Sequence, residues 1–400
     1  MLLQSAISQV INTQKETLAK RDPGLKREAL DALPDLTSFA LIVSGIRRCG
    51  KSTLLFQLLT AKYPAALYLN FEDPRLYEFE PADFTRMDEA IKLSGSTVLF
   101  FDEIQIIPEW ERYARQKLDE GFKIVITGSN ASLLSRELGT KLTGRHVSKE
   151  LFPFSYHEFC DFRKQKASKA SLLDYLETGG FPEYVKQGVP DILNQLFEDI
   201  LTRDIVVRYG IRDVRTLKRL AFYLVSNVGK LITGTRLKSL FGMGSTSTVM
   251  EYLSHLEYSY LLHFVPKFSH SLRKQLVNPR KVYAIDTGLI NVNSGSFSAD
   301  EGRKFENLVF LNLRRNYREI YYFAEKGECD FIVIQNHTFH EAVQVCFELN
   351  RDNLDREVNG LVEALEFFEA AEGTIVTLDQ TDTIEKNGKV IHVVPAYVFF

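Results

Sequence analysis

Residues 45–52 read Gly-Ile-Arg-Arg-Cys-Gly-Lys-Ser, between the apolar run 39–43 and a stretch with helical spacing. A Gly-x-x-x-x-Gly-Lys-Ser pattern between a strand and a helix is typical of a loop that holds phosphate groups. Its glycines let backbone N–H groups curl around a β-phosphate, its lysine reaches the β- and γ-oxygens, and its serine hydroxyl binds Mg²⁺. We therefore expect ATP and Mg²⁺ as ligands. The residues expected to contact them are Gly45, Ile46, Arg47, Arg48, Cys49, Gly50, Lys51, Ser52 and Thr53.

A second apolar run, residues 97–101, ends in the carboxylates Asp102 and Glu103. This predicts a Walker B element, in which Asp102 holds Mg²⁺ through water and Glu103 polarises the water that attacks the γ-phosphate. Phosphate transfer to a metabolite needs no such glutamate, so the pair favours ATP hydrolysis. Lys51 and Glu103 are then catalytic residues, and Ser52 and Asp102 are metal ligands.

Polar residues also follow the next apolar run, 123–127. Thr127, Ser129 and Asn130 are candidates to sense the γ-phosphate, with Asn130 taken as catalytic. The alternative is that they cap the helix expected from Ala131. Arginine fingers, which act on the nucleotide of a neighbouring subunit, are the other expected element. The two candidates for that role are Arg136 and Arg145, and we favour Arg145.

The first half of the chain alternates continuous apolar runs with helical patterns, which predicts an α/β domain whose parallel sheet is covered on both faces. The expected strands are residues 39–43, 66–71, 97–101 and 123–127. Residues 2–18 have helical spacing and are expected to pack beside this domain.

The remainder of the chain predicts further units. After a polar stretch at 163–169, the pattern is helical from 171 to 220. Two short helical patterns then flank Gly242-Met243-Gly244, and strands are expected at 261–264 and 281–285. The last hundred residues predict a second α/β unit, with helices at 302–316 and 351–371 and strands near 320–323, 331–334, 341–347 and 374–378.

The formal net charge of −3 conceals two opposite segments. Residues 211–290 have 12 Lys and Arg against 4 Asp and Glu, a difference of +8, whereas residues 301–400 have 10 against 18, a difference of −8. The middle segment therefore has the electrostatics of a polyanion binder.

The helical patterns around residues 242–244 fit a helix-turn-helix, with the following strands as a wing. Residues 245–248, Ser-Thr-Ser-Thr, would begin the recognition helix and face a phosphate or a base edge. The candidate phosphate contacts are Arg236, Lys238, Lys267, Arg273, Lys274, Arg280 and Lys281. The alternative is that this module binds protein.

At 400 residues and 45.8 kDa, with 45% hydrophobic and 25% charged residues, the chain fits a soluble globular protein of two or three domains. We expect no export signal and no membrane span. Cys49, Cys160, Cys329 and Cys346 are far apart, which favours reduced thiols in the cytoplasm over a zinc site.

The chain resembles the bacterial and archaeal P-loop ATPases in which an AAA-type domain precedes a DUF4143 region, the AAA_14/DUF4143 family. Residues 45–52, 69–73, 101–105 and 151–155 carry the resemblance. It implies four parts: an AAA-like P-loop ATPase core at 1–155, a helical lid at 156–214, a winged helix at 215–292, and a DUF4143, nuclease-like α/β domain of the PD-(D/E)xK fold at 293–400.

The resemblance also implies particular site residues. Gly180-Phe181-Pro182 is similar to the turn by which lids of related ATPases touch the adenine, so Pro182 is expected to contact nucleotide, unless this is simply a tight turn. In the nuclease-like fold, Glu306 lies on a helix and Asp330 enters a strand. An active enzyme would have an acidic residue at 344 and a lysine at 346. Because this chain has Gln344 and Cys346, we expect a structural or partner-binding remnant, with weak nuclease activity as the alternative.

The leading hypothesis is an ATP-hydrolysing AAA-like protein whose nucleotide state moves a lid and a winged helix that contacts duplex DNA. A second hypothesis is a nucleotide-gated switch that recruits protein partners, with the C-terminal domain as a docking site and the chain in a homo-oligomer. A third, less favoured, is a Mg²⁺-dependent nuclease licensed by ATP.

Overall fold

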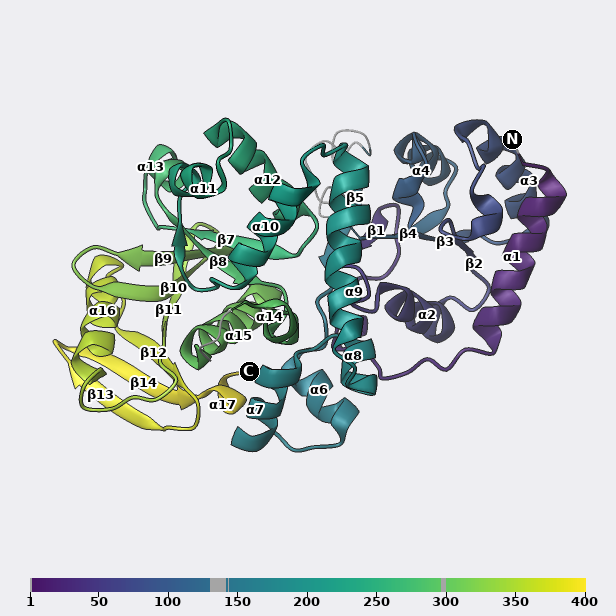
Figure 1. Ribbon diagram of the computed structural model, residues 1–400. Helices are drawn as coiled ribbons and strands as arrows, with labels where there is room; N and C mark the ends of the chain where they lie inside the picture. The colour runs from purple at the N-terminus through teal and green to yellow at the C-terminus, as the bar shows by residue number, and fades with distance from the viewer. Residues whose placement is uncertain (1, 130–141, 143, 296–299) are drawn as a thin grey trace. The chain divides into compact units, whose positions relative to one another are not determined.

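A computed structural model describes residues 2–129, 142, 144–295 and 300–400 (Figure 1). The chain divides into two compact units, Met1–Phe152 and Pro153–Phe400. The expected boundary between the first two parts, 155/156, therefore lies three residues beyond the observed one.

The first unit is built on a five-stranded sheet in the order β2-β3-β4-β1-β5, in which every neighbouring pair is parallel. Its strands are β1 (Ala40–Ser44), β2 (Leu67–Asn70), β3 (Val98–Asp102), β4 (Lys123–Gly128) and β5 (His146–Glu150). The first four coincide with the apolar runs of the sequence. Because all strands run the same way, their carboxyl ends meet at one edge of the sheet, where parallel α/β sheets bind ligands.

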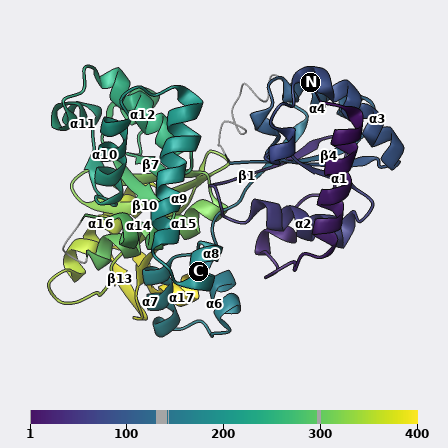
Figure 2. The ribbon, with the colours of Figure 1, turned by 45° about the vertical axis from the view of Figure 1, so that its right-hand side comes forward.

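Helices cover both faces of this sheet (Figures 1 and 2). They are α1 (Gln4–Ala19), α2 (Lys51–Lys62), α3 (Phe84–Ser94) and α4 (Trp110–Asp119). One core cluster joins α1, α3 and α4 to Ala40 and Ile42 of β1. Since side chains alternate along a strand, the buried Leu41 and Val43 point to the opposite face, which α2 covers. The expected two-sided covering is confirmed.

The second unit begins with helices and continues into a small sheet. The helices are α6 (Tyr156–Arg163), α7 (Lys169–Thr178), α8 (Pro182–Gln187), α9 (Asp191–Asp199), a π-helical continuation (Ile200–Val207) and α10 (Val214–Val225). After α10, helices α11 (Gly234–Phe241) and α12 (Thr246–Tyr258) pack together across the Gly242 turn. Strands β6 (Leu231–Ile232), β8 (Arg280–Ala284) and β7 (Leu262–Pro266) form an antiparallel sheet in that order, with α13 (Leu272–Val277) between β7 and β8 in the chain. This is the element order expected of a winged helix, an assignment that stays a prediction.

The end of the chain forms a six-stranded mixed sheet in the order β13-β14-β12-β11-β10-β9. Its strands are β9 (Glu319–Ala324), β10 (Glu328–Gln335), β11 (Thr338–Val345), β12 (Glu372–Thr377), β13 (Asp382–Lys386) and β14 (Lys389–Pro395). Helix α16 (Leu354–Phe367) packs on one face through a core that includes Cys329, Ile332 and Cys346. The remaining helices are α14 (Thr287–Asn293), α15 (Glu301–Asn316) and α17 (Ala396–Phe399).

Helix α15 joins the two sheets of the second unit. Asn307 pairs twice with the backbone of Ala284 on β8, at 2.7 and 2.9 Å. Phe310 stacks on Tyr283 of β8 with ring centroids 4.4 Å apart, and it lies 6.0 Å from Phe331 of β10. Strand β8 is therefore fixed against the C-terminal sheet through α15.

Several of these elements lie outside the expected set, namely β5, β6, α13, α14, α17 and the hairpin β13-β14. Strand β5 is a polar edge strand whose burial alternates, so it forms no apolar run. The hairpin turns at Asn387-Gly388, both with positive φ (52° and 70°), which is a recognisable turn signal. Among the described residues, no helix is long and apolar enough to cross a membrane.

Candidate functional site

The loop of residues 45–50 leaves β1 and opens α2 at Lys51. Gly50 has a φ of 102°, a left-handed conformation that glycine tolerates best, and a Cβ added there would meet Nη1 of Arg27 at 2.7 Å. Within the described part of the chain, no side chain caps the first turn of α2. Its backbone N–H groups therefore remain available to an anion, as a phosphate site requires.

Lys51 is buried with its ammonium turned into the loop. Its Nζ donates to the carbonyl oxygens of Gly45 and Ile46, at 3.1 Å each, and lies 3.6 Å from the Glu103 carboxylate. Burial lowers the pKa of Lys51, but the Glu103, Cys49 and Asp102 groups together outweigh burial, so the net shift is upward. The lysine is therefore a charged group at the centre of the loop.

Asp102 ends β3 on the same edge of the sheet, where two hydroxyl groups fix its carboxylate. Tyr68 of β2 donates to it at 2.8 Å, and Thr127 of β4 donates to its other oxygen. The pKa of the Tyr68 hydroxyl is raised, first by burial and then by the Asp102 charge, so it remains a donor. The carboxylate expected to hold Mg²⁺ is thus fully buried and rigidly oriented.

Glu103 follows in a left-handed backbone conformation, with φ 55°, and its N–H donates to Thr127 Oγ1 at 3.1 Å. Gln105 donates to its carboxylate. Burial raises the pKa of Glu103, but the charge of Lys51, the hydrogen bond from Gln105 and the other nearby donors together outweigh burial, so the net shift is downward. The glutamate is therefore ionised, as a group that polarises water must be.

The remaining predicted site residues have different outcomes. Thr127 is the hydroxyl that holds Asp102, and the backbone of Ser129 contributes to lowering the pKa of Glu103. Asn130 and Arg136 lie outside the described residues.

Arg145 precedes β5, and its guanidinium is 2.5 Å from Asp119. Pro182 opens α8 in the second unit. The finger role of Arg145 and the adenine contact of Pro182 stay predictions.

Arg27 is a residue that the sequence reasoning missed. It is 2% exposed, and its guanidinium donates to the carbonyl oxygens of Cys49 at 2.7 Å and Phe152 at 2.8 Å. Gln57 of α2 accepts from its backbone N–H at 3.1 Å. Arg27 therefore supports the phosphate loop by holding the backbone of Cys49 in place. Its position 22 residues before Cys49 gives no local signal, because only the fold brings the two together.

These residues fit ATP and Mg²⁺. The first turn of α2 and Lys51 provide the N–H groups and the positive charge that phosphates require, and the Ser52 hydroxyl and Asp102 provide the oxygen ligands that Mg²⁺ prefers. All of them lie at one edge of one sheet.

The seven candidate phosphate contacts of the middle segment differ in exposure, and Lys238 and Arg280 are half-buried. Arg236, Arg273 and Lys274 are exposed, as a phosphate contact requires. Lys281 is buried and pairs with carboxylates, so its predicted phosphate contact is wrong. Lys267 pairs with Glu325 at 3.0 Å. The Ser245 hydroxyl caps α12 by accepting from the Thr248 N–H at 3.0 Å.

Comparison with known proteins gives two matches to family models. Residues 37–160 match an AAA domain, and residues 169–300 match a domain of unknown function, DUF8612. The resemblance implied a DUF4143 domain at residues 293–400, whereas the model that matches after the AAA domain is DUF8612, over residues 169–300.

Two relatives align over most of their length. The uncharacterized protein MJ1544 of Methanocaldococcus jannaschii is 32% identical over 88% of this chain and 86% of its own length. An uncharacterized protein of Haemophilus influenzae is 33% identical over 78% of this chain and 84% of its own length. Among solved structures, AMPPCP-bound DnaA from Aquifex aeolicus is 13% identical over 62% of this chain and 88% of that chain, with a TM-score of 0.27, which is too low to support any argument.

Proposed function

Since this chain belongs to the same family as these two relatives and carries an AAA domain, we propose that it binds ATP with Mg²⁺ and hydrolyses it at the loop of residues 45–52. One observation carries the proposal. The buried ammonium of Lys51 and the ionised carboxylate of Glu103 lie 3.6 Å apart, beside a helix N-terminus without a side-chain cap.

Each group has a distinct role in this proposal. Lys51 and the backbone N–H groups of the loop hold the β- and γ-phosphates, and Ser52 and Asp102 hold the metal ion. Mg²⁺, when bound, neutralises charge that develops on the phosphates. Glu103 accepts a hydrogen bond from the attacking water and orients it in line with the γ-phosphate. Tyr68 and Thr127 keep Asp102 in place.

The test is steady-state phosphate release from Mg-ATP by the full chain and by Lys51→Ala. Lys62→Ala is a matched control, because Lys62 lies at the other end of α2 and pairs with Asp35 on the surface at 3.1 Å. We expect Lys51→Ala to lose nucleotide binding and at least about a hundredfold in rate, in line with the removal of one positioned catalytic group. Equal rates in all three proteins would refute the assignment.

A second proposal concerns three exposed basic residues of the second unit. We propose that Arg236 on α11 and Arg273 and Lys274 on α13 contact the phosphates of duplex DNA, because all three are exposed. Helix α12 has no Lys or Arg and carries Glu251 and Glu257. The contact would therefore be to the backbone, with little reading of base edges by α12.

The Arg273→Ala/Lys274→Ala variant tests the second proposal. Binding of duplex DNA should weaken, and the slope of log affinity against log salt should become shallower by about two. Lys267→Ala is the control, since Lys267 already pairs with Glu325. If wild-type protein shows no salt-dependent DNA binding, the module is instead a protein-binding one, and the recruiting switch becomes the better account.

A further inference from the structure

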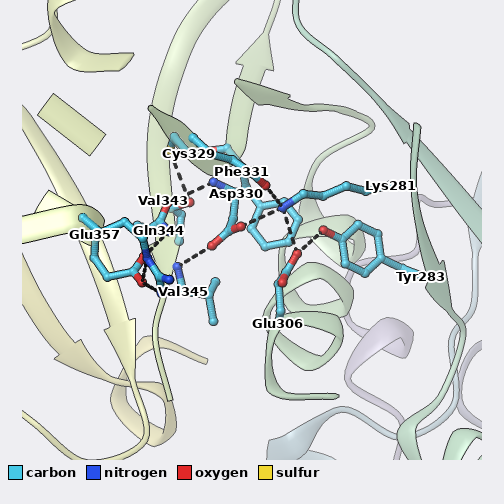
Figure 3. Close-up of polar contacts among 12 residues, drawn as sticks. Lys281, Tyr283, Glu306, Cys329, Asp330, Phe331, Val343, Gln344, Val345 and Glu357 are labelled. Carbon is cyan, nitrogen blue, oxygen red and sulfur yellow. Dashed lines mark hydrogen bonds and ion pairs between the residues drawn. The ribbon is translucent and has the colours of Figure 1, made fainter. Parts of the chain in front are cut away.

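A cluster of carboxylates lies between the two sheets of the second unit (Figure 3). Glu306 projects from α15, and Glu328 and Asp330 come from the start of β10. In an active nuclease of the fold that the chain resembles, Asp330 and an acidic residue at position 344 would hold Mg²⁺. The contacts in this cluster determine whether its residues fit such an ion.

A lysine from another strand already fills the cluster. Nζ of Lys281, on β8, lies 2.7 Å from Asp330, 2.7 Å from Glu328 and 3.1 Å from Glu306. Its side chain is 3% exposed. Tyr283, two residues along β8 and so on the same face of the strand, donates to Glu306 at 2.6 Å. Figure 3 shows Lys281 and Tyr283 converging on the carboxylates from one side.

The other atoms that would complete a metal site are also occupied. The second oxygen of Asp330 accepts from the Val345 N–H at 3.0 Å. The side-chain oxygen of Gln344 accepts from the Asp330 N–H at 3.1 Å, and its amide nitrogen donates to Glu357 at 2.5 Å. Each half of the Gln344 amide therefore has a partner within the protein.

Position 346 supplies no charge either. Cys346 packs in the core beneath α16. Burial, with the Glu357 charge, raises the pKa of its thiol to about 11, so it is neutral at physiological pH. The lysine that would support a nucleophilic water is thus replaced by an apolar contact.

The buried lysine supplies positive charge inside the cluster. Burial, and then the Asp330 charge, raises the pKa of Glu306 to about 7. Burial lowers the pKa of Lys281, but the Asp330, Tyr283 and Glu306 groups raise it further, so it stays charged. The ammonium offsets part of the negative charge of Asp330 and Glu328, and it occupies the point between the three carboxylates at which a divalent ion would have to lie.

We infer that Lys281 is the resident cation of this cluster: its ammonium takes the place of a divalent ion and makes the nuclease-like site a structural joint between β8 and the C-terminal sheet. The residues do not fit Mg²⁺, and in the described residues no group of three His, Cys, Asp or Glu side chains is arranged to hold a metal. The small sheet β6-β8-β7 and the C-terminal sheet are then joined into one rigid body. This inference is independent of ATP hydrolysis.

Thermal unfolding with and without MnCl₂, in the absence of nucleotide, tests this joint. Lys281→Ala removes the cation and leaves room among the carboxylates, so its melting temperature should fall by several degrees, and Mn²⁺ should raise it again by binding the folded state. Mn²⁺ should not stabilise wild-type protein. Lys267→Ala is the matched control, because Lys267 directly follows the neighbouring strand β7 and forms a more exposed ion pair. An unchanged melting temperature in Lys281→Ala, or equal stabilisation of all three proteins by Mn²⁺, would overturn the inference.

Two further measurements keep the test decisive. If Lys281→Ala does not fold, a variant with Lys281→Met, Glu306→Gln and Asp330→Asn removes the cation together with two carboxylates, and it should fold. Its failure to fold counts against a purely electrostatic joint. Wild-type protein should not cleave plasmid or single-stranded DNA with Mg²⁺ or Mn²⁺. Cleavage that disappears in Asp330→Ala would refute the structural role.

Discussion

The Arg27→Ala substitution is expected to destabilise the first unit strongly. It removes two hydrogen bonds from a guanidinium that is 2% exposed, one to Cys49 at 2.7 Å and one to Phe152 at 2.8 Å. A hydrogen bond to a charged group contributes about 1.5–3 kcal/mol, and both carbonyl groups would lose this donor. The free energy of unfolding should therefore fall by about 3–6 kcal/mol.

Trp110 makes this measurement specific to the first unit. It is the one tryptophan in the sequence and is buried in the core of that unit. Its fluorescence during urea unfolding reports the first unit alone, which matters because a two-unit chain need not unfold in a single step. Lys26→Ala is the control, since Lys26 pairs with Asp31 on the surface, and it should cost less than about 1 kcal/mol.

Comparison of Arg27→Lys with Arg27→Ala separates the contribution of the charge from that of the paired donors. Arg27→Lys keeps the charge, but an ammonium does not reproduce the paired donors of a guanidinium, so its stability should lie between those of wild type and Arg27→Ala. A loss in Arg27→Ala no larger than that in Lys26→Ala would show that Arg27 does not support the loop.

Three other substitutions probe separate parts of the chain. Gly50→Ala places a Cβ 2.7 Å from Arg27 Nη1 at a φ of 102°, so nucleotide affinity in a fluorescence titration should fall at least tenfold, and wild-type affinity would contradict this. Tyr68→Phe removes the 2.8 Å hydrogen bond to Asp102, so the Mg²⁺ concentration that supports half-maximal hydrolysis should rise, and an unchanged Mg²⁺ dependence would count against Tyr68 as a support. Burial, with a nearby arginine, lowers the pKa of His263 to about 3, so folding keeps it neutral while the unfolded chain gains a proton below pH 6.5. Stability from this group is therefore lost as the pH falls, by about 2 kcal/mol between pH 7 and pH 5, and His263→Phe should reduce the acid sensitivity of unfolding by that amount.

The proposed nucleotide site could be recognised from sequence because its signals are local. The glycines, Lys51 and Ser52 occupy consecutive positions between a strand and a helix, and Asp102 and Glu103 follow directly on an apolar strand. Continuous apolar runs also located the four buried parallel strands, since such strands have no polar face. The polar edge strand β5 has no such run and was missed.

Contacts between distant segments could not be predicted in this way. Arg27 reads as an ordinary charged residue of a loop, and its partner Phe152 is 125 positions away. Lys281 was assigned to a DNA surface because it belongs to a basic segment, but it lies 49 positions from Asp330 and is buried against it. The count of charged residues therefore identified an excess of Lys and Arg in this segment. It did not identify the role of Lys281, because that role depends on the packing of β8 against β10.

The most direct test of the central claim is a comparison of ATP binding and single-turnover ATP hydrolysis in wild-type protein and Glu103→Gln. The amide keeps the shape of the side chain but removes the charge that polarises water. The account predicts that Glu103→Gln still binds Mg-ATP and hydrolyses it at least about a hundredfold more slowly. Hydrolysis at the wild-type rate by Glu103→Gln would contradict it, because the water would then be activated without this carboxylate.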